Sequence, residues 1–168
     1  MKFSKIFILF LFFSCSTAKV ITDYDNKIDF STFKTYNYFE NVGNGLSDLD
    51  LKRVIYSLNK ELKLRGFAKS EKPDFFINVM SNVIEIENNN SIGIGVGNGG
   101  FGISGGIPIG SKKLLEEFNI EYVSSKKDEV IWEGFLSSKI KESRSPIDRE
   151  LHYKEIIKLI LNTYPPKK

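Results

Sequence analysis

The sequence predicts an α+β domain in which an antiparallel or mixed β-sheet carries two amphipathic helices packed on one face. Three observations support this prediction. Two long segments repeat apolar residues at helical spacing, several others alternate between two sets of side chains as strands do, and their order along the chain is strand, helix, strands, hairpin, helix. One sheet with both helices on the same face would bury all of these apolar stripes.

The first strand is predicted at Thr35–Glu40, near the end of a segment dense in aromatic and β-branched residues. Tyr36 and Tyr38 share one parity in this strand, and we interpret both as core residues. The preceding residues, 15–31, are polar enough to form a short tether. We therefore expect the folded domain to span residues 32–168.

The first helix is predicted between an N-cap at Ser47 or Asp48 and a terminating glycine, Gly66. Lysine, arginine and glutamate side chains cover the face opposite its apolar stripe. The predicted stripe consists of Leu51, Ile55, Leu58, Leu62 and Leu64. Truncation of a leucine in the middle of this stripe is expected to destabilise the domain.

One long strand is predicted over residues 74–87, where two sets of side chains alternate. Two further strands, 114–125 and 129–139, flank the polar turn 126–128 and predict a hairpin. Trp132 alternates with apolar neighbours in the second of these strands, so we interpret it as a core anchor.

The terminal helix is predicted to open at Pro146 and to stop before Pro165 and Pro166, because proline suits the first helical turn but not the interior. Its apolar stripe consists of Leu151, Ile156, Ile157, Ile160 and Leu161.

Residues 91–110 are mostly glycine and isoleucine, and Gly95–Gly100 fit G-x-G-x-x-G by letter. Such a loop holds phosphate where a strand leads into a helix N-terminus. Here the alternating pattern resumes after Gly100, and Ser111 follows Gly110 where a P-loop would carry lysine. We interpret the segment as a mobile hairpin or loop that turns at residues 98–100; the alternative is an ordered edge that binds a partner.

The first fifteen residues have the order of an export signal: basic Lys2 and Lys5, an apolar run over 6–13, small Ser14 and then Cys15. The apolar run is too short for a permanent membrane span, which needs about 20 residues. We predict cleavage after residue 14 and lipidation of Cys15. The alternative is ordinary cleavage after Ala18 in a Ser-Thr-Ala site, which removes the cysteine with the signal.

Composition excludes several classes of function. The chain has one cysteine and one histidine, so it forms no intramolecular disulfide and offers no zinc-type ligand set. The net charge of +3 falls to +1 once Lys2 and Lys5 leave with the signal, so nucleic-acid binding has no electrostatic basis. About 150 residues remain, the usual size of one domain with its own core.

Several short motifs, in this order, resemble the DUF4136 family of bacterial envelope lipoproteins. They are Asp23-Tyr24-Asp25, Asp29-Phe30-Ser31, Lys34-Thr35-Tyr36, Leu64-Arg65-Gly66-Phe67, Pro73-Asp74-Phe75-Phe76-Ile77, Val130-Ile131-Trp132-Glu133-Gly134 and Tyr164-Pro165-Pro166. The chain departs from the family pattern at Tyr38, where tryptophan is more typical. The resemblance implies an exported, usually lipid-anchored α/β domain and no established activity.

No residue pattern predicts catalysis, so the predicted sites are catalytic none, cofactor none and metal none, with lipidation at Cys15. His152 lies beside Tyr153 with no nucleophile motif, and we interpret it as a surface or helix-flank residue. Glu85 and Glu87 share a strand face, which suits paired carboxylates in a cleft or, more simply, a solvated strand end. The aspartates at 23, 25 and 29 lack the calcium-loop pattern.

We therefore expect an exported, lipid-anchored envelope protein with a noncatalytic binding or structural role. Its location would be the outer membrane, facing the periplasm, and its partners would be the membrane, through the N-terminal lipid, and an envelope protein. The alternative function is an envelope hydrolase that uses an unfamiliar carboxylate site.

Overall fold

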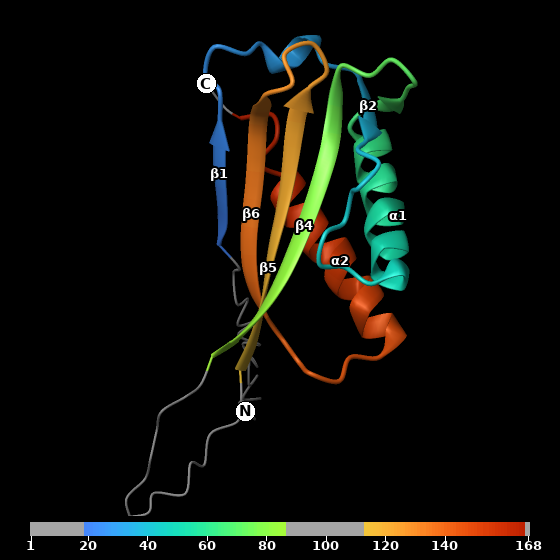
Figure 1. Cartoon of the computed structure of the whole chain (residues 1–168), viewed down its shortest axis with the longest axis vertical. Helices are drawn as coiled ribbons and strands as arrows, with labels where there is room; N and C mark the ends of the chain where they lie inside the picture. Colours follow the sequence, from blue (N-terminus) through green and yellow to red (C-terminus); the bar gives the residue numbers. More distant parts are fainter. Residues whose placement is uncertain (1–18, 87–112, 167–168) are drawn as a thin grey trace, which may run out of the picture.

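A six-stranded mixed sheet covered on one face by two helices forms the fold, as the computed structural model shows for residues 19–86 and 113–166 (Figure 1). The strand order is β1-β6-β5-β4-β2-β3, with antiparallel pairing from β1 through β4 and parallel pairing from β4 to β3. The predicted α+β class is confirmed. The elements are β1 (Val20–Tyr24), a 3-10 turn (Phe30–Thr32), β2 (Thr35–Tyr38), α1 (Asp48–Leu64), β3 (Ala68–Lys69), β4 (Phe75–Ile86), β5 (Lys113–Ser124), β6 (Val130–Ile140) and α2 (Pro146–Leu161).

Helix α1 begins and ends as predicted, and its buried face agrees with the predicted stripe except at Leu64. The Ser47 hydroxyl accepts a hydrogen bond from the Asp50 amide at the N-terminus, and Gly66 takes the left-handed φ of +86° after the last turn. Leu58 and Leu62 are buried, whereas Leu64 is 73% exposed. The core face is completed by Asp50, Val54 and Ser57. Leu51 and Ile55 of the predicted stripe are half-buried, and apolar spacing did not indicate Asp50 and Ser57 because both are polar.

The predicted start and end of helix α2 are confirmed, but one residue of its predicted apolar stripe is exposed. Ser145 and Asp148 form a capping box, and the helix ends at Leu161, before Pro165. Leu151, which was predicted to be in the stripe, is 56% exposed. The buried residues are Tyr153, Ile156, Ile157, Ile160 and Leu161. Tyr153 takes the core position because its hydroxyl reaches a buried carboxylate of the sheet.

The core lies between the helices and one face of β4, β5 and β6. Alternate residues of β4 and β5 are buried there, and the ring centroids of Phe75 and Tyr122 lie 4.4 Å apart. Trp132 is fully buried, as predicted. Tyr36 is buried and Tyr38 is half-buried, and both hydroxyls donate to the same amide oxygen of Asn59.

The N-terminal part of the described chain is not a tether. Val20–Tyr24 forms the edge strand β1 and pairs antiparallel with β6, so the fold begins near Val20 instead of residue 32. The polar residues are accommodated because one face of an edge strand remains in solvent. The predicted hairpin or loop at 91–110 lies outside the described residues. Within the described part of the chain, neither helix has the length and apolar character to cross a membrane.

Candidate functional site

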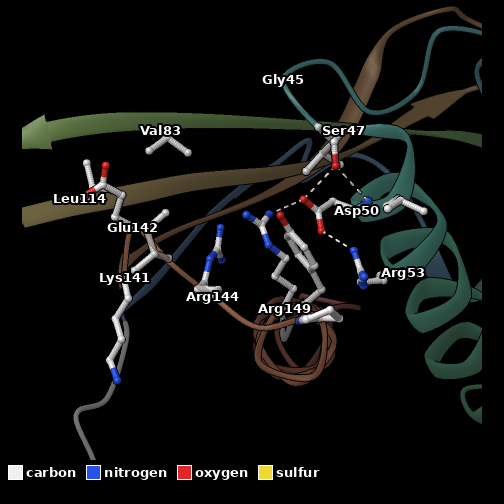
Figure 2. A pocket seen from close by; sticks show the side chains of 15 residues that line it. Gly45, Ser47, Asp50, Arg53, Val83, Leu114, Lys141, Glu142, Arg144 and Arg149 are labelled. Carbon is white, nitrogen blue, oxygen red and sulfur yellow. Dashed lines mark hydrogen bonds and ion pairs between the residues drawn. The ribbon is translucent and has the colours of Figure 1, made fainter.

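A cleft of about 510 Å³ lies where α1 and α2 begin, against the neighbouring ends of β4, β5 and β6 (Figure 2). Its lining includes the apolar residues Leu46, Leu49, Val83, Leu114 and Ile140, and the charged residues Lys141 and Glu142. The connection before α1 is held against β4, since the Ser81 amide donates to the Asn44 carbonyl at 2.9 Å. Gly45, at φ +83°, makes this close approach feasible, because a Cβ there would collide with the Ser81 carbonyl oxygen.

One carboxylate in the cleft joins the two helices. Asp50 is 4% exposed, and its Oδ1 accepts a hydrogen bond from Arg53 Nη1 at 2.8 Å. Its Oδ2 accepts from Arg149 Nη1 at 2.6 Å and from the Ser47 hydroxyl at 3.0 Å. Two guanidinium groups therefore share one buried carboxylate, which leaves a net positive charge at this point.

A second carboxylate, that of Glu116, is 1% exposed and lies beneath the cleft on β5. Its Oε1 accepts from the Ser81 hydroxyl at 2.9 Å and from the Tyr153 hydroxyl at 3.0 Å. Its Oε2 lies 2.7 Å from His152 Nε2 and accepts from Arg144 Nη1 at 3.1 Å. All four contacts come from groups far away in the sequence.

The pKa of Glu116 is set by these contacts. Desolvation by burial acts to raise it, but the hydrogen bond and charge of His152, the Ser81 hydroxyl and the Arg144 guanidinium outweigh burial and lower the pKa to about 2. Desolvation by burial raises the pKa of the Tyr153 hydroxyl, and the neighbouring Glu116 carboxylate raises it further. Glu116 is therefore a fixed negative charge at neutral pH.

Some N–H groups of the arginines in the cleft have no hydrogen-bond partner among the described residues. Arg144 is 10% exposed, and its Nε has no hydrogen-bond partner among the described residues. Arg144 and Arg149 extend from the chain around the start of α2 toward the strands, whereas the Lys141 side chain is directed away from them (Figure 2). The arrangement suits binding of an anion better than proton transfer.

The residues considered from sequence have different outcomes. His152 was interpreted as a surface or helix-flank residue; it lies on α2, is half-buried, and its Nε2 is 2.7 Å from Glu116 Oε2, a partner that the sequence did not indicate. Glu85 is exposed on β4 and does not line the cleft, while Cys15 and Glu87 lie outside the described residues. In residues 19–86 and 113–166, no group of three His, Cys, Asp or Glu side chains is placed to hold a metal ion.

Sequence reasoning missed both buried carboxylates and the arginines that pair with them. A signal for one of them was present, because Glu116 shares the parity of Phe118, Ile120 and Tyr122, which face the core. An acid on the apolar parity of a strand indicates a buried charge that needs partners. The partners of Glu116 come from β4, from the segment before α2 and from α2 itself, and no local pattern identifies them.

The fold and cleft define an α+β domain with a helix-backed mixed sheet and a cationic cleft at its helix N-termini. The chain belongs to the DUF4136 family, a domain of unknown function, whose family model matches residues 20–166. No curated protein matches the chain.

Two solved structures resemble this fold. A PDZ domain protein from Parabacteroides distasonis ATCC 8503 has a TM-score of 0.57 at 18% identity, covering 90% of this chain and 36% of that one. A variant PelC dodecamer from Paraburkholderia phytofirmans has a TM-score of 0.50 at 10% identity, covering 85% of this chain and 95% of that one. The chain thus spans about a third of the first protein. At these identities the likeness shows the fold alone.

Proposed function

We propose that this chain is an exported cell-envelope protein, anchored through a lipid on Cys15, whose domain has a noncatalytic binding role. The support for export and anchoring is the order of a basic segment, an apolar run, Ser14 and Cys15 at the start of the chain. The proposed location is the outer membrane, facing the periplasm. An envelope partner or component is the proposed target of the domain.

The observation that carries the binding role is the state of the two buried carboxylates at the cleft. Asp50 has both oxygens occupied by guanidinium groups, and Glu116 accepts four contacts and has a pKa of about 2. A carboxylate with so low a pKa is a weak base and has no proton to donate at neutral pH. These acids hold the walls of the cleft in place, and the arginines are the groups available for contact with a ligand.

The hydrolase alternative depended on Glu85 and Glu87 lining a deep polar pocket. Glu85 is exposed and is not part of the cleft, so this alternative gains no support from the described residues. The binding role is therefore the function that we propose.

Replacement of Cys15 tests the anchoring directly, because only its thiol can receive a diacylglycerol. Cys15→Ala should appear in the soluble envelope fraction or remain unprocessed, whereas Ser16→Ala should fractionate with the membrane like the wild type. The measurement is fractionation followed by gel mobility and by labelling with a fatty-acid analogue. Wild-type fractionation and mobility of Cys15→Ala would refute the lipid anchor.

A further inference from the structure

We propose that the cleft at the helix N-termini binds an anionic amphiphile, with its anionic headgroup at the arginines and its acyl chain along the apolar wall. The inference rests on the proposed binding role and names the chemistry of its ligand. The headgroup would be a carboxylate or a phosphate, and three features of the cleft support this ligand class.

The first feature is a set of arginine N–H groups that make no hydrogen bond with the described residues. Arg53 and Arg149 each reach Asp50 through Nη1, and in the part of the chain that the structure describes neither guanidinium makes another hydrogen bond. Their side chains are 21% and 33% exposed, so the remaining N–H groups are accessible to a ligand. Arginine presents a planar set of donors that matches carboxylate and phosphate oxygens.

The second feature is an apolar wall beside these donors. Leu49 is 62% exposed and Val83 is 49% exposed, and both line the cleft together with Leu46, Leu114 and Ile140. Val83 and Leu114 lie along the strands, to one side of Arg144 and Arg149, and the Glu142 side chain is at that end of the cleft as well (Figure 2). The volume of about 510 Å³ falls in the range of roughly 300 to 1,000 Å³ typical of small-molecule sites.

The third feature is the end of the sheet at which the cleft lies. Strand β1 begins at Val20, opposite Leu136, and Ile140 of the cleft follows Leu136 on β6 at a distance of about 13 Å along the strand. Helices α1 and α2 begin at the same end (Figure 1). Cys15 precedes Val20 by five residues, a reach of at most about 18 Å. A lipid on Cys15 would therefore hold this end of the sheet near the membrane, where amphiphiles are available.

Titration of the full chain with four probes tests the ligand class. The chain is reconstituted in phosphatidylcholine nanodiscs, heats are measured by calorimetry, and the titration of empty nanodiscs is subtracted. Octanoate or octyl phosphate should bind saturably at one site, and the tighter of the two identifies the headgroup. Octyl glucoside and inorganic phosphate should bind at least tenfold more weakly. Octyl glucoside lacks the anionic headgroup, and inorganic phosphate lacks the apolar chain. Anchoring is not measured here, so failure of the titration leaves the Cys15 result unaffected.

Two pairs of variants locate the site. Leu49→Glu places an acid in the first turn of α1, where it favours the helix, but it should weaken the anionic probes at least tenfold. Leu64→Glu, the same change at an exposed position at the other end of α1, should bind like the wild type. Arg149→Ala should also weaken binding of the anionic probes tenfold, and Arg149→Lys should recover part of that affinity. Absence of saturable binding, equal binding of octyl glucoside, or equal loss in Leu64→Glu would overturn the proposal.

Discussion

Replacing Glu116 with glutamine gives a quantitative test of the buried network. Folding lowers the pKa of this carboxyl from an ordinary value of 4.5 to about 2. Such a difference contributes about 3 kcal/mol to the free energy of unfolding at neutral pH. Because the folded pKa is the lower one, this stabilisation is fully present above pH 4.5 and is lost as the pH falls toward 2. About 2 kcal/mol of it should be lost between pH 5.5 and pH 3.

Glu116→Gln removes the charge at every pH and leaves Arg144 and His152 without their anionic partner. Breaking a buried pair in this way costs about 3 to 5 kcal/mol. The penalty, measured by urea unfolding followed by far-UV circular dichroism, should be full at pH 5.5 and smaller by about 2 kcal/mol at pH 3. Glu117→Gln is the matched control, since Glu117 accepts one exposed hydrogen bond of 3.3 Å and should cost less than about 1 kcal/mol. A penalty for Glu116→Gln that is the same at both pH values would refute the reasoning.

The remaining predictions concern packing and backbone geometry. Leu58→Ala should lower the free energy of unfolding by about 2 to 5 kcal/mol, because Leu58 is fully buried. Lys60→Ala should have little effect, because Lys60 is exposed. Equal melting temperatures of the two variants would show that the assigned buried face of the helix is wrong. Gly45→Ala should cost more than about 3 kcal/mol in urea unfolding, because its Cβ meets a backbone carbonyl of β4, whereas Gly66→Ala, with free space at a similar φ, should cost about 1 to 2 kcal/mol; similar losses would contradict the close approach. Ser145→Ala should lower the free energy of unfolding by about 1 kcal/mol through loss of the capping box, and an unchanged value would mean that the cap is not formed in solution.

The elements were predictable because their signals are local. The N-cap at Ser47, the terminating Gly66, the turn 126–128 and the buried Trp132 each follow from residue types at short range. The errors occurred where burial depends on a partner distant in sequence. Leu64 and Leu151 fit apolar spacing, but the buried helix faces include Asp50 and Tyr153, each of which has a hydrogen-bond partner on another element.

The candidate site was less predictable than the fold for the same reason. Glu116 and His152 are 36 residues apart, and Asp50 and Arg149 are 99 apart. Asp74 gives a further example: its carboxylate accepts hydrogen bonds from the backbone of Lys34 and Thr35, about 40 residues earlier, and so joins the entry of β2 to β4. Apolar periodicity contains no information about such pairs, because it locates buried surface and not the partners of a buried charge.

The aromatic surroundings of Trp132 allow its fluorescence to report unfolding of the domain. Trp132 is the single tryptophan of the chain, and its ring centroid lies 4.7 Å from that of Tyr122 on β5 and 5.3 Å from that of Tyr164, which follows α2. Its fluorescence emission therefore responds to separation of the β5–β6 pair and to release of the chain after α2 from the sheet. A fluorescence transition that precedes the loss of circular dichroism would reveal that this C-terminal segment detaches first, and coincident transitions would indicate one cooperative unit.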